Sequence, residues 1–464
     1  MSSTHAGSTA ASGKPILKSV PRLSLRENLA AVSAIRRDQL EFMQNAVRNH
    51  GDIFHMRLGG LPMIMVNHPD HFQRVLVDNH PNYDKDNFLY RAVRSVLREG
   101  LIGNIGGESW RHHRRLMQPS FHRSRVADFV VNITDLTAEL FRRWESQLYV
   151  DDLVDVTTEI ADLALRIVLR SLFGVDMDER SRKFAEEFVE VNTIVGDFFR
   201  FPFPPLSWRT PSRNRLRTLI KEMDGFVSHL IQARTSDDSE RNDLFTRLLN
   251  ARDAKTGTGL TPGQLANEIL AMIVAGYETS SNSISWIFYQ LAEHQEIQRR
   301  VQDEVDDVLG GRPPTFDDLP KLTYTGMVID ETLRLFTPAW HTMRHAIEED
   351  VIGGYHIPKG SNIYLNLFIY HRHPDFWPEP TRFNPERFSP EEVAKRPRNL
   401  YQPYGSGPRL CIGKHFAQAE LLIMAAMFAQ TFHVTRPQGQ PPVGFAPLIT
   451  LHPKGGIHLR LRRR

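Results

Sequence analysis

The chain has one cysteine, Cys411, and glycines surround it at positions 405, 407 and 413. Glycines let a backbone bend tightly and approach a flat partner, and their N–H groups can point at a sulfur atom. An apolar helix is predicted to follow directly, and its positive end favours a thiolate over a thiol. A small buried hydrophobic side chain is the structural alternative for a single cysteine. The glycine pattern favours a thiolate that is a metal ligand or a nucleophile.

A cysteine nucleophile needs a histidine base and an orienting Asn or Asp. The chain has 20 histidines, but no familiar cysteine-protease signature surrounds Cys411. One thiolate without a second cluster of ligands suits a metal that arrives with four ligands of its own. That description fits haem iron with an axial cysteine.

The segment Tyr404-Gly405-Ser-Gly-Pro-Arg409-Leu-Cys411-Ile-Gly413 resembles the haem-binding signature of the cytochrome P-450 superfamily. The resemblance implies that Cys411 is the axial ligand of haem b, within a loop shaped by Tyr404, Gly405 and Gly413. Tyr404 stands where the family signature has Phe. Its hydroxyl needs a hydrogen-bond partner and can alter the potential of the iron.

A second resemblance lies within a helix predicted to start at Pro262 and to continue to about residue 294. Its middle, residues 269–277, is apolar on all sides, which is typical of a buried helix. The segment Ala275-Gly276-Tyr-Glu278-Thr279 resembles the family's Ala-Gly-x-Glu-Thr pattern. The resemblance implies that Thr279 hydrogen-bonds dioxygen, that Glu278 relays protons, and that Ala275 and Gly276 leave room beside the iron. Without it, Thr279 is a threonine that bonds back to the preceding turn.

A third resemblance is the segment Glu331-Thr-Leu-Arg334, which is similar to the family's Glu-x-x-Arg motif. On its own, an acid and a base at this spacing form a solvated helix pair. Together with Arg387, the resemblance implies a buried triad that holds the proximal side of the haem.

Trp110-Arg-His-His-Arg114 is similar to the family's Trp-x-x-x-Arg. A spacing of four residues puts Trp110 and Arg114 on one helix face, where the indole N–H and the guanidinium can meet a haem propionate. Arg344 and Arg409 match two further family positions that often bind propionates. We expect His112 and His113 to be solvated or packing residues.

The resemblance implies a monooxygenase that inserts one atom of O2 into an apolar small molecule such as a terpenoid, fatty acid, steroid or polyketide. A peroxide-using peroxygenase or a haem-thiolate isomerase or dehydratase is one alternative, and a non-catalytic haem sensor or carrier is another. Glu278 and Thr279 argue against both, because neither needs a pair that activates oxygen. Family analogy places Phe88, Ala271, Ala275, Trp340 and Leu448 in the substrate pocket, where core packing is the alternative for each.

No flavin or iron–sulfur segment is recognisable in the chain, so the electrons should come from a separate ferredoxin or flavodoxin with its reductase. These partners are usually acidic. Arg114, Arg115, Lys414 and the region 123–125 are candidates for a basic docking patch.

The composition is that of a globular protein of 464 residues, with 41% hydrophobic and 24% charged residues. A net charge of +3 gives no argument for nucleic acid or a membrane surface, although a local basic patch stays possible. The lone cysteine fits a reducing compartment, and no apolar run approaches the ~18 residues that span a bilayer. We therefore expect a cytoplasmic monomer without a membrane anchor.

The fold class expected is mainly α with a small β region, and the resemblance adds the cytochrome P-450 fold, with haem between the long central helix and the cysteine loop. Residues 1–20 are predicted to be a disordered leader and residues 21–464 a single domain. Predicted helices cover residues 38–50, 124–148, 154–173, 180–199, 213–234, 241–252, 296–309, 321–335 and 414–432 besides the central one. Predicted strands cover 53–58 and 61–66 as a hairpin, and 447–452 and 457–462 near the end of the chain. A loop is expected at 198–211 and an irregular stretch at 373–398.

Overall fold

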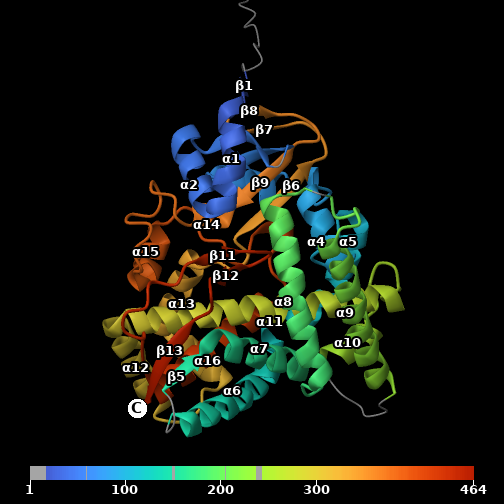
Figure 1. Ribbon diagram of the computed structural model, residues 1–464. Coiled ribbons are helices and arrows are strands. Elements are labelled where there is room, and N and C mark those ends of the chain that lie inside the picture. Colours follow the sequence, from blue (N-terminus) through green and yellow to red (C-terminus); the bar gives the residue numbers. More distant parts are fainter. Residues whose placement is uncertain (1–16, 59, 149–151, 204, 237–242) are drawn as a thin grey trace, which may run out of the picture.

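Helix α11 (Pro262–Glu293) crosses the centre of the molecule, as Figure 1 shows in yellow. Its start follows from a capping box, in which Thr261 and Gln264 satisfy each other's backbone N–H groups and Pro262 occupies the first turn. Most of its residues from Ile269 onward are buried, as the apolar pattern predicts. The computed structural model describes residues 17–464 except 59, 149–151, 204 and 237–242.

Helices surround α11 on several sides. It packs against α7 (Val156–Phe173), α12 (Gln295–Leu309), α13 (Thr323–Leu335) and α16 (Lys414–Thr431), and α6 (Ala127–Gln147) packs in turn against α7 and α16. On the other side lie α8 (Glu179–Arg200), α9 (Pro211–Thr235) and α10 (Leu244–Asn250), with α4 (Phe88–Leu97) and α5 (Gly107–Met117) beside them. Helices α1 (Leu25–Arg37) and α2 (Gln39–His50) lie with the largest sheet, and α3 (Pro69–Gln73), α14 (Leu367–Tyr370) and α15 (Pro390–Lys395) are short.

The largest sheet has the strand order β2-β3-β9-β6-β4. Its strands are β2 (Ile53–Leu58), β3 (Leu61–Val66), β4 (Tyr83–Asp84), β6 (His341–Ala346) and β9 (Asn362–Asn366). The remaining strands are β1 (Lys18–Ser19), β5 (Leu153–Asp155), β7 (Asp350–Ile352), β8 (Tyr355–Ile357), β10 (Phe432–Thr435), β11 (Phe445–Pro447), β12 (Leu451–Pro453) and β13 (His458–Arg463). They form the small sheets β1-β8-β7 and β10-β13-β5 and the hairpin β11-β12. The mainly α fold with a small β region is therefore confirmed.

The predicted leader ends too late. Lys18 and Ser19 pair in parallel with Tyr355 and His356, and the Lys18 N–H donates to Gly354, so the ordered chain begins before residue 20. Residues 1–16 lie outside the described part of the chain. The prediction missed the longer helices α1 and α4 and the short helices α3, α14 and α15. Helix α1 buries only Ala31 and Ile35, so its apolar stripe is too narrow to give a clear 3.6-residue period.

Candidate functional site

The loop before α16 is held in shape by its glycines. Gly405 and Gly407 have φ angles of +73° and +66°, which favour glycine. A Cβ at Gly407 would also overlap the carbonyl oxygen of Leu76. The N–H of Cys411 donates to the carbonyl of Tyr404 at 2.9 Å, which closes the loop. The glycines at positions 405 and 407 are therefore required by the backbone, whereas Gly413 has a φ angle of −86° and open space around it.

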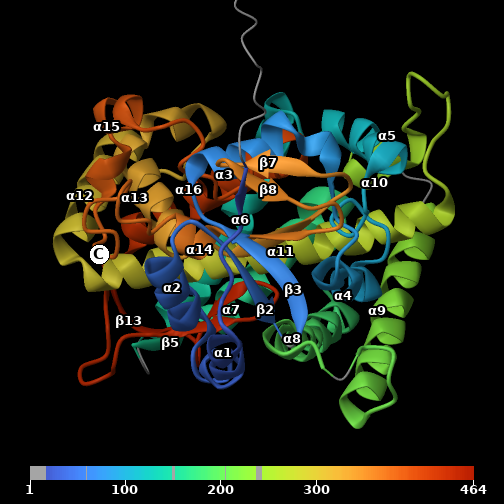
Figure 2. The same cartoon turned by 90° about the horizontal axis from the view of Figure 1, so that it is seen from above.

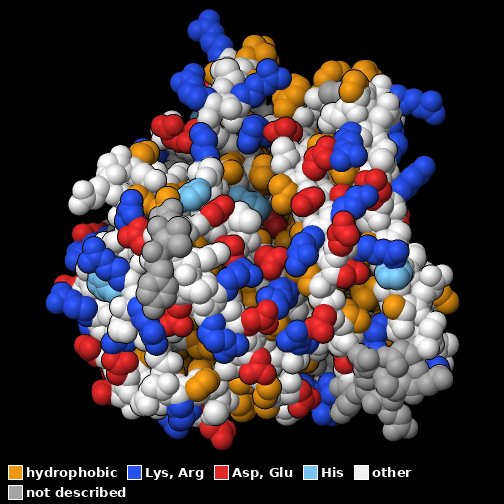
Figure 3. Space-filling model, turned by 60° about the horizontal axis from the view of Figure 1, so that its bottom comes forward, with side chains coloured by type: hydrophobic (Ala, Val, Ile, Leu, Met, Phe, Trp, Pro, Cys, Tyr) orange, Lys and Arg blue, Asp and Glu red, His pale blue; other side chains and the backbone are white. Residues whose placement is uncertain are grey.

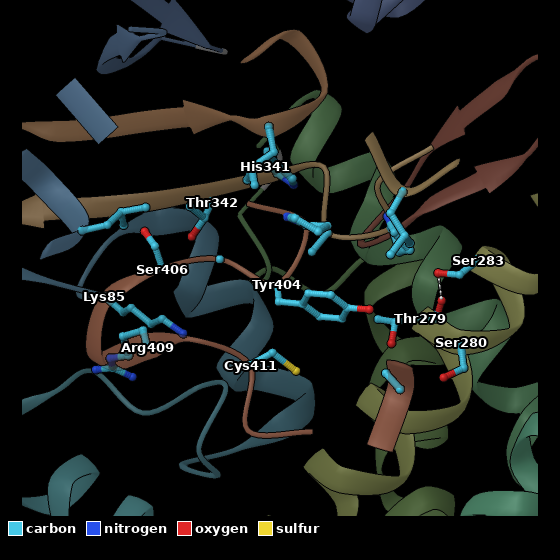
Figure 4. Close-up of a pocket in the computed structure, with 18 of the residues that line it drawn as sticks. Lys85, Thr279, Ser280, Ser283, His341, Thr342, Tyr404, Ser406, Arg409 and Cys411 are labelled. Atoms are coloured by element: carbon cyan, nitrogen blue, oxygen red, sulfur yellow. Dashed lines mark hydrogen bonds between the residues drawn. The ribbon is translucent and has the colours of Figure 1, made fainter. Parts of the chain in front are cut away.

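The Cys411 side chain lines a pocket between this loop, α11 and β6, and Figure 4 shows its sulfur beside Tyr404. Cys411 is exposed to this pocket, while the surrounding protein atoms desolvate the thiol and raise its pKa. A hydrogen bond from the backbone of Gly413 and the charges of Arg114 and Lys414 act in the opposite direction. The loop thus supplies donors and cations for a thiolate, while a metal would supply the remaining stabilisation.

Among the described residues, the same pocket is lined by three cations, Lys85, Arg344 and Arg409, and by no carboxylate. Burial and the charge of Arg344 lower the pKa of Arg409 to about 9. Burial, Arg409 and Arg344 also lower the pKa of Lys85. Like charges brought together in a buried place require anions, and the two propionates of a haem supply them. The residues present therefore fit a haem group.

Protein contacts aim these cations at the pocket. Arg409 donates to the carbonyls of Asn104 and Ile105, and its guanidinium lies 4.2 Å from the centre of the Trp110 ring. Lys85 donates to the carbonyl of Ile102 at 2.8 Å. The sequence did not predict Lys85 as a site residue, because a lysine between two aspartates is typical of a solvated run of charges.

Arg114 contacts the cysteine loop directly. Its Nη1 donates to the carbonyl of Leu410 at 3.0 Å and its Nε to the side chain of Gln118. Arg344 is buried on β6 and donates to the hydroxyl of Thr342 at 2.8 Å. The structure thus brings Arg344 and Arg409 to the pocket wall, and it brings Trp110 and Arg114 into contact with the same loop.

Helix α11 is open to the pocket over one turn, where Thr279, Ser280 and Ser283 line it. Thr279 is half-buried, as are Ala275 and Gly276 beside it, although neither of these two lines the pocket. The Thr279 hydroxyl donates to the carbonyl of Ala275 at 2.7 Å, which leaves its oxygen free to accept a hydrogen bond. A Cβ at Gly276 would lie 2.7 Å from the Val168 side chain, so close packing against α7 accounts for this glycine.

Glu278 lies on the other side of α11, away from the pocket lining. Its Oε1 accepts from Asn192 of α8 and Thr450, both at 2.7 Å, and from His452 Nε2 at 2.5 Å. The Glu278 carboxyl is buried, whereas the His452 side chain is 22% exposed. The pair therefore links a buried acid of the central helix to the molecular surface.

The predicted triad residues are brought together. Arg334 binds both carboxylate oxygens of Glu331, at 2.7 and 2.8 Å, and both side chains are fully buried. Arg387 Nε lies 3.4 Å from Glu331 Oε1, which also accepts from the N–H of Asn384. The cluster joins α13 to the irregular stretch before the cysteine loop.

The predicted substrate residues have a different arrangement. Trp340 is fully buried, stacks on His341 and donates to the carbonyl of Leu448 at 3.1 Å. Phe88, Ala271, Ala275, Trp340 and Leu448 are not among the residues that line the pocket around Cys411, whereas Ala339, His341 and Thr342 are. Ala271 lies instead against Gly100.

His341 of β6 also lines the pocket. Aromatic rings surround it, with centroids at 4.0 Å for Trp340, 5.4 Å for Tyr364 and 5.7 Å for Phe199. Its Nδ1 is buried and has no hydrogen-bond partner in the described part of the chain. Burial lowers its pKa to about 3, so the ring is neutral at physiological pH.

The family model for cytochrome P450 matches residues 19–460, and the chain belongs to this family. It is 31% identical to cyclooctat-9-en-7-ol 5-monooxygenase of Streptomyces melanosporofaciens over 88% of this chain and 87% of that protein. It is also 31% identical to pentalenene oxygenase of Streptomyces avermitilis, over 92% and 94% of the two chains. Cyclooctatin synthase of Streptomyces melanosporofaciens is 30% identical over 85% of each chain.

Membership of the family makes the protein an oxidoreductase, a haem monooxygenase that acts on apolar substrates with O2 and electrons from redox partners. It also implies haem with a cysteine thiolate as the iron ligand, and Cys411 is the one cysteine of the chain. Among the described residues, none of the helices combines the length and the hydropathy needed to cross a bilayer.

Proposed function

We propose that the protein hydroxylates a terpenoid, using haem b and electrons from a ferredoxin or flavodoxin with its reductase. One arrangement carries the proposal: the Cys411 sulfur faces a pocket whose other walls are the open turn of α11 and the cations Lys85, Arg344 and Arg409. A flat metal cofactor that carries two carboxylates would match these walls.

When bound, the haem supplies the oxygen-activating chemistry. The chain's part is to hold and orient the group. Cys411 would bind the iron, and Lys85, Arg344 and Arg409 would bind the propionates. Trp110 and Arg114 would act mainly through their contacts with Arg409 and Leu410. Tyr404, Gly405 and Gly413 would keep the loop in place beside the ring.

Proton supply would fall to the acid and the hydroxyl of α11. Thr279 places an accepting oxygen at the open turn, and Glu278 is its neighbour in the chain. The bond between Glu278 and the partly exposed His452 gives this acid a contact with solvent. We assign the entry of protons to His452, and their transfer toward the pocket to Glu278, whose side chain would turn from His452 toward Thr279 to deliver them.

A terpenoid is favoured by the lining and by the relatives. The pocket walls away from the cations are largely apolar, with Leu76, Leu333, Pro338, Ala339, Leu367 and Leu421. Two relatives are named for cyclooctat-9-en-7-ol and pentalenene. Neutral His341 offers one hydrogen bond in these surroundings, which suits a substrate with a single hydroxyl or carbonyl.

The docking patch for a redox partner is narrower than the sequence suggests. Arg115 binds Asp253 and Glu108, and Arg114 binds Leu410, so both are engaged within the chain. Arg123 is exposed and Lys414 is half-buried, and neither forms an ion pair among the described residues, so these two remain as candidates to meet an acidic partner. We further propose a monomer that works in the cytoplasm, which agrees with a single cysteine.

The first test is the absorption difference spectrum of the reduced protein with and without carbon monoxide. A strongly red-shifted Soret band is expected for thiolate-bound haem, and Cys411→Ser should abolish that band while leaving the protein folded by circular dichroism. A shifted band that survives in Cys411→Ser would overturn the ligand assignment. Turnover of terpenes with NADPH and a ferredoxin system, compared with peroxide alone, separates a monooxygenase from a peroxygenase.

A further inference from the structure

A buried cation outside the haem pocket has no acidic partner. Arg372, which follows α14, is only 9% exposed, and no carboxylate of the described residues forms an ion pair with it. Burial and the charge of Arg334 lower its pKa. Glu331 acts in the opposite direction, but Arg334 already binds both of its oxygens. A buried charge without a counterion is costly, so an anion from outside the chain would stabilise Arg372.

The hydrogen bonds of Arg372 leave part of its guanidinium available. It donates through Nη1 to the carbonyl of Phe368 at 3.0 Å and through Nη2 to the carbonyl of Leu335. These bonds use two of its five N–H groups. The guanidinium lies 3.6 Å from the centre of the Phe368 ring and 5.8 Å from that of Phe445. The carbonyls and rings fix its orientation, but they carry no full negative charge.

Arg372 lines a cavity of about 660 Å³ that shares no lining residue with the pocket around Cys411. The walls come from the end of α1, the start of α2, the ends of α8 and α13, α14 and β11. Figures 1 and 2 both show α14 beside α2, although the two are far apart in the sequence. Much of the wall is apolar, with Ile35, Leu40, Leu335, Phe336, Phe445 and Pro447. A cavity of this size with apolar walls is typical of a small-molecule site.

Cations exceed acids around this cavity. The lining includes five cations, Arg36, Arg37, Arg200, Arg372 and Lys454, and two acids, Asp38 and Glu41. Arg200 pairs with Asp197, but Arg37 and Lys454 are exposed and form no ion pair within the described ranges. Over much of the face drawn in Figure 3, Lys and Arg side chains are interspersed with Asp and Glu. The cavity therefore has a local excess of positive charge.

The hairpin β11-β12 brings an exposed cation near the buried one. The ring of Phe445 contacts the Arg372 guanidinium. Gly444, the residue before it, accepts from the N–H of Lys454 at 2.9 Å, and a Cβ at Gly444 would contact the Lys454 side chain. Lys454 thus lies at the same end of the hairpin as the ring beside Arg372. This arrangement places a flexible cation near a fixed one.

We propose that this cavity binds an amphiphilic phosphate, that is, a phosphate ester with an apolar body. The phosphate binds the fixed guanidinium of Arg372 and the flexible side chains of Lys454 and Arg37, since a guanidinium matches phosphate oxygens through its planar fork. The apolar body packs on Phe336 and Phe445. A phosphate monoester is close to doubly charged at neutral pH, which matches the excess of cations. The proposal does not depend on the reaction that the haem site performs.

Other ligands fit the cavity less well. Inorganic phosphate would use the cations but would leave the apolar walls in contact with water. A neutral terpenoid would cover the apolar walls but would leave Arg372 buried without a counterion. A phosphate ester with an apolar body uses both kinds of wall.

Calorimetric titration with octyl phosphate tests the proposal on the haem-loaded full chain. We expect saturable binding that leaves the Soret band unshifted and that becomes weaker at high salt. Imidazole bound to the haem iron should leave this binding unchanged, because the two cavities share no lining residue. Inorganic phosphate should bind more weakly by roughly tenfold or more, because it lacks the apolar body.

Variants at the cavity give the site-specific measurement. Arg37→Gln/Lys454→Gln removes the two exposed cations and should weaken binding of octyl phosphate by roughly tenfold. Thr381→Glu adds a negative charge at an exposed lining position and should also weaken binding. Lys359→Gln/Arg398→Gln changes an exposed lysine and an exposed arginine outside the cavity. This matched control should bind octyl phosphate as the parent does.

Arg372→Met should abolish the binding in a protein that keeps the carbon monoxide spectrum of the parent. The exposed-cation variant tests the site whether or not Arg372→Met folds. Equal affinities of the parent and Arg37→Gln/Lys454→Gln for octyl phosphate would refute the proposal. Equal affinities of the parent for octyl phosphate and inorganic phosphate would also contradict it. Loss of binding in the presence of imidazole would place the ligand in the haem pocket instead.

Discussion

At the scale of single residues, Lys85 gives the sharpest test of how the haem is held. Lys85→Met removes one of three cations that have no carboxylate partner in the pocket. A hydrogen bond to a charged group contributes about 1.5–3 kcal/mol, so haem should dissociate roughly 10- to 100-fold more readily. Transfer of haem to apomyoglobin measures this. Lys359→Met, which removes an exposed lysine, is the control and should leave the transfer rate unchanged.

The role of Thr279 can be tested by comparing the NADPH consumed with the product formed. Thr279→Ala removes the oxygen that the open turn of α11 presents to the pocket. We expect NADPH consumption to continue while product falls and hydrogen peroxide rises, because the proton transfers that complete the reaction lose their mediator. Thr279→Ser keeps the hydroxyl and should keep most of the coupling. Unchanged coupling in Thr279→Ala would contradict the assigned role.

The residues found from the sequence share one property: they belong to motifs with fixed spacing. Cys411, the Glu331–Arg334 pair and Trp110 each stand in such a pattern, and the structure places them around one loop and its support. Lys85 and His452 stand in no pattern, because their importance comes from what distant segments bring next to them. His452 meets Glu278 only through the hairpin β11-β12, which local sequence does not position.

At the scale of elements, the helices with strong local sequence signals were predicted correctly. The predicted helix 262–294 is α11 (Pro262–Glu293), because the Thr261–Gln264 capping box and the apolar core both mark it. The hairpin 53–58 and 61–66 is β2 and β3. Helix α1 and the pairing of β1 with β8 were missed, since an exposed helix with two buried residues and a two-residue strand carry little periodicity.

The contact between α7 and α11 supplies a prediction about packing. Gly276→Ala would bring a methyl group to 2.7 Å from Val168, which overpacks the interface and should cost about 1–3 kcal/mol of stability. Val168→Ala should cost about 0.5–2 kcal/mol on its own by loss of buried area. In the double variant the two costs should not add, because the smaller side chain at position 168 makes room for the methyl group added at position 276. Denaturant unfolding of all four proteins measures the coupling, and strict additivity would show that Gly276 has another role.

At the scale of the whole molecule, one buried carboxyl makes the free energy of unfolding depend on pH. Glu420 of α16 is buried, accepts from Ser280 of α11 at 2.5 Å, and leaves its other oxygen unpartnered within the described part of the chain. Burial raises its pKa to about 8, so the folded protein holds a proton there that the unfolded chain releases above about pH 4.5. The contribution of Glu420 to the free energy of unfolding is fully present below that pH and is lost as the pH rises toward 8.

Glu420→Gln should remove this dependence, because the amide keeps an acceptor for Ser280 and carries no charge at any pH. Each unit of pKa difference corresponds to about 1.4 kcal/mol, so the variant should gain several kcal/mol over the parent at pH 8 and little at pH 5. Urea unfolding of the haem-loaded proteins at both values measures the difference. Glu391→Gln changes an exposed carboxyl and should have the same stability as the parent at both pH values. Equal stabilities of Glu420→Gln and the parent at pH 8 would mean that solvent or a neighbouring group stabilises the Glu420 carboxylate in the folded protein.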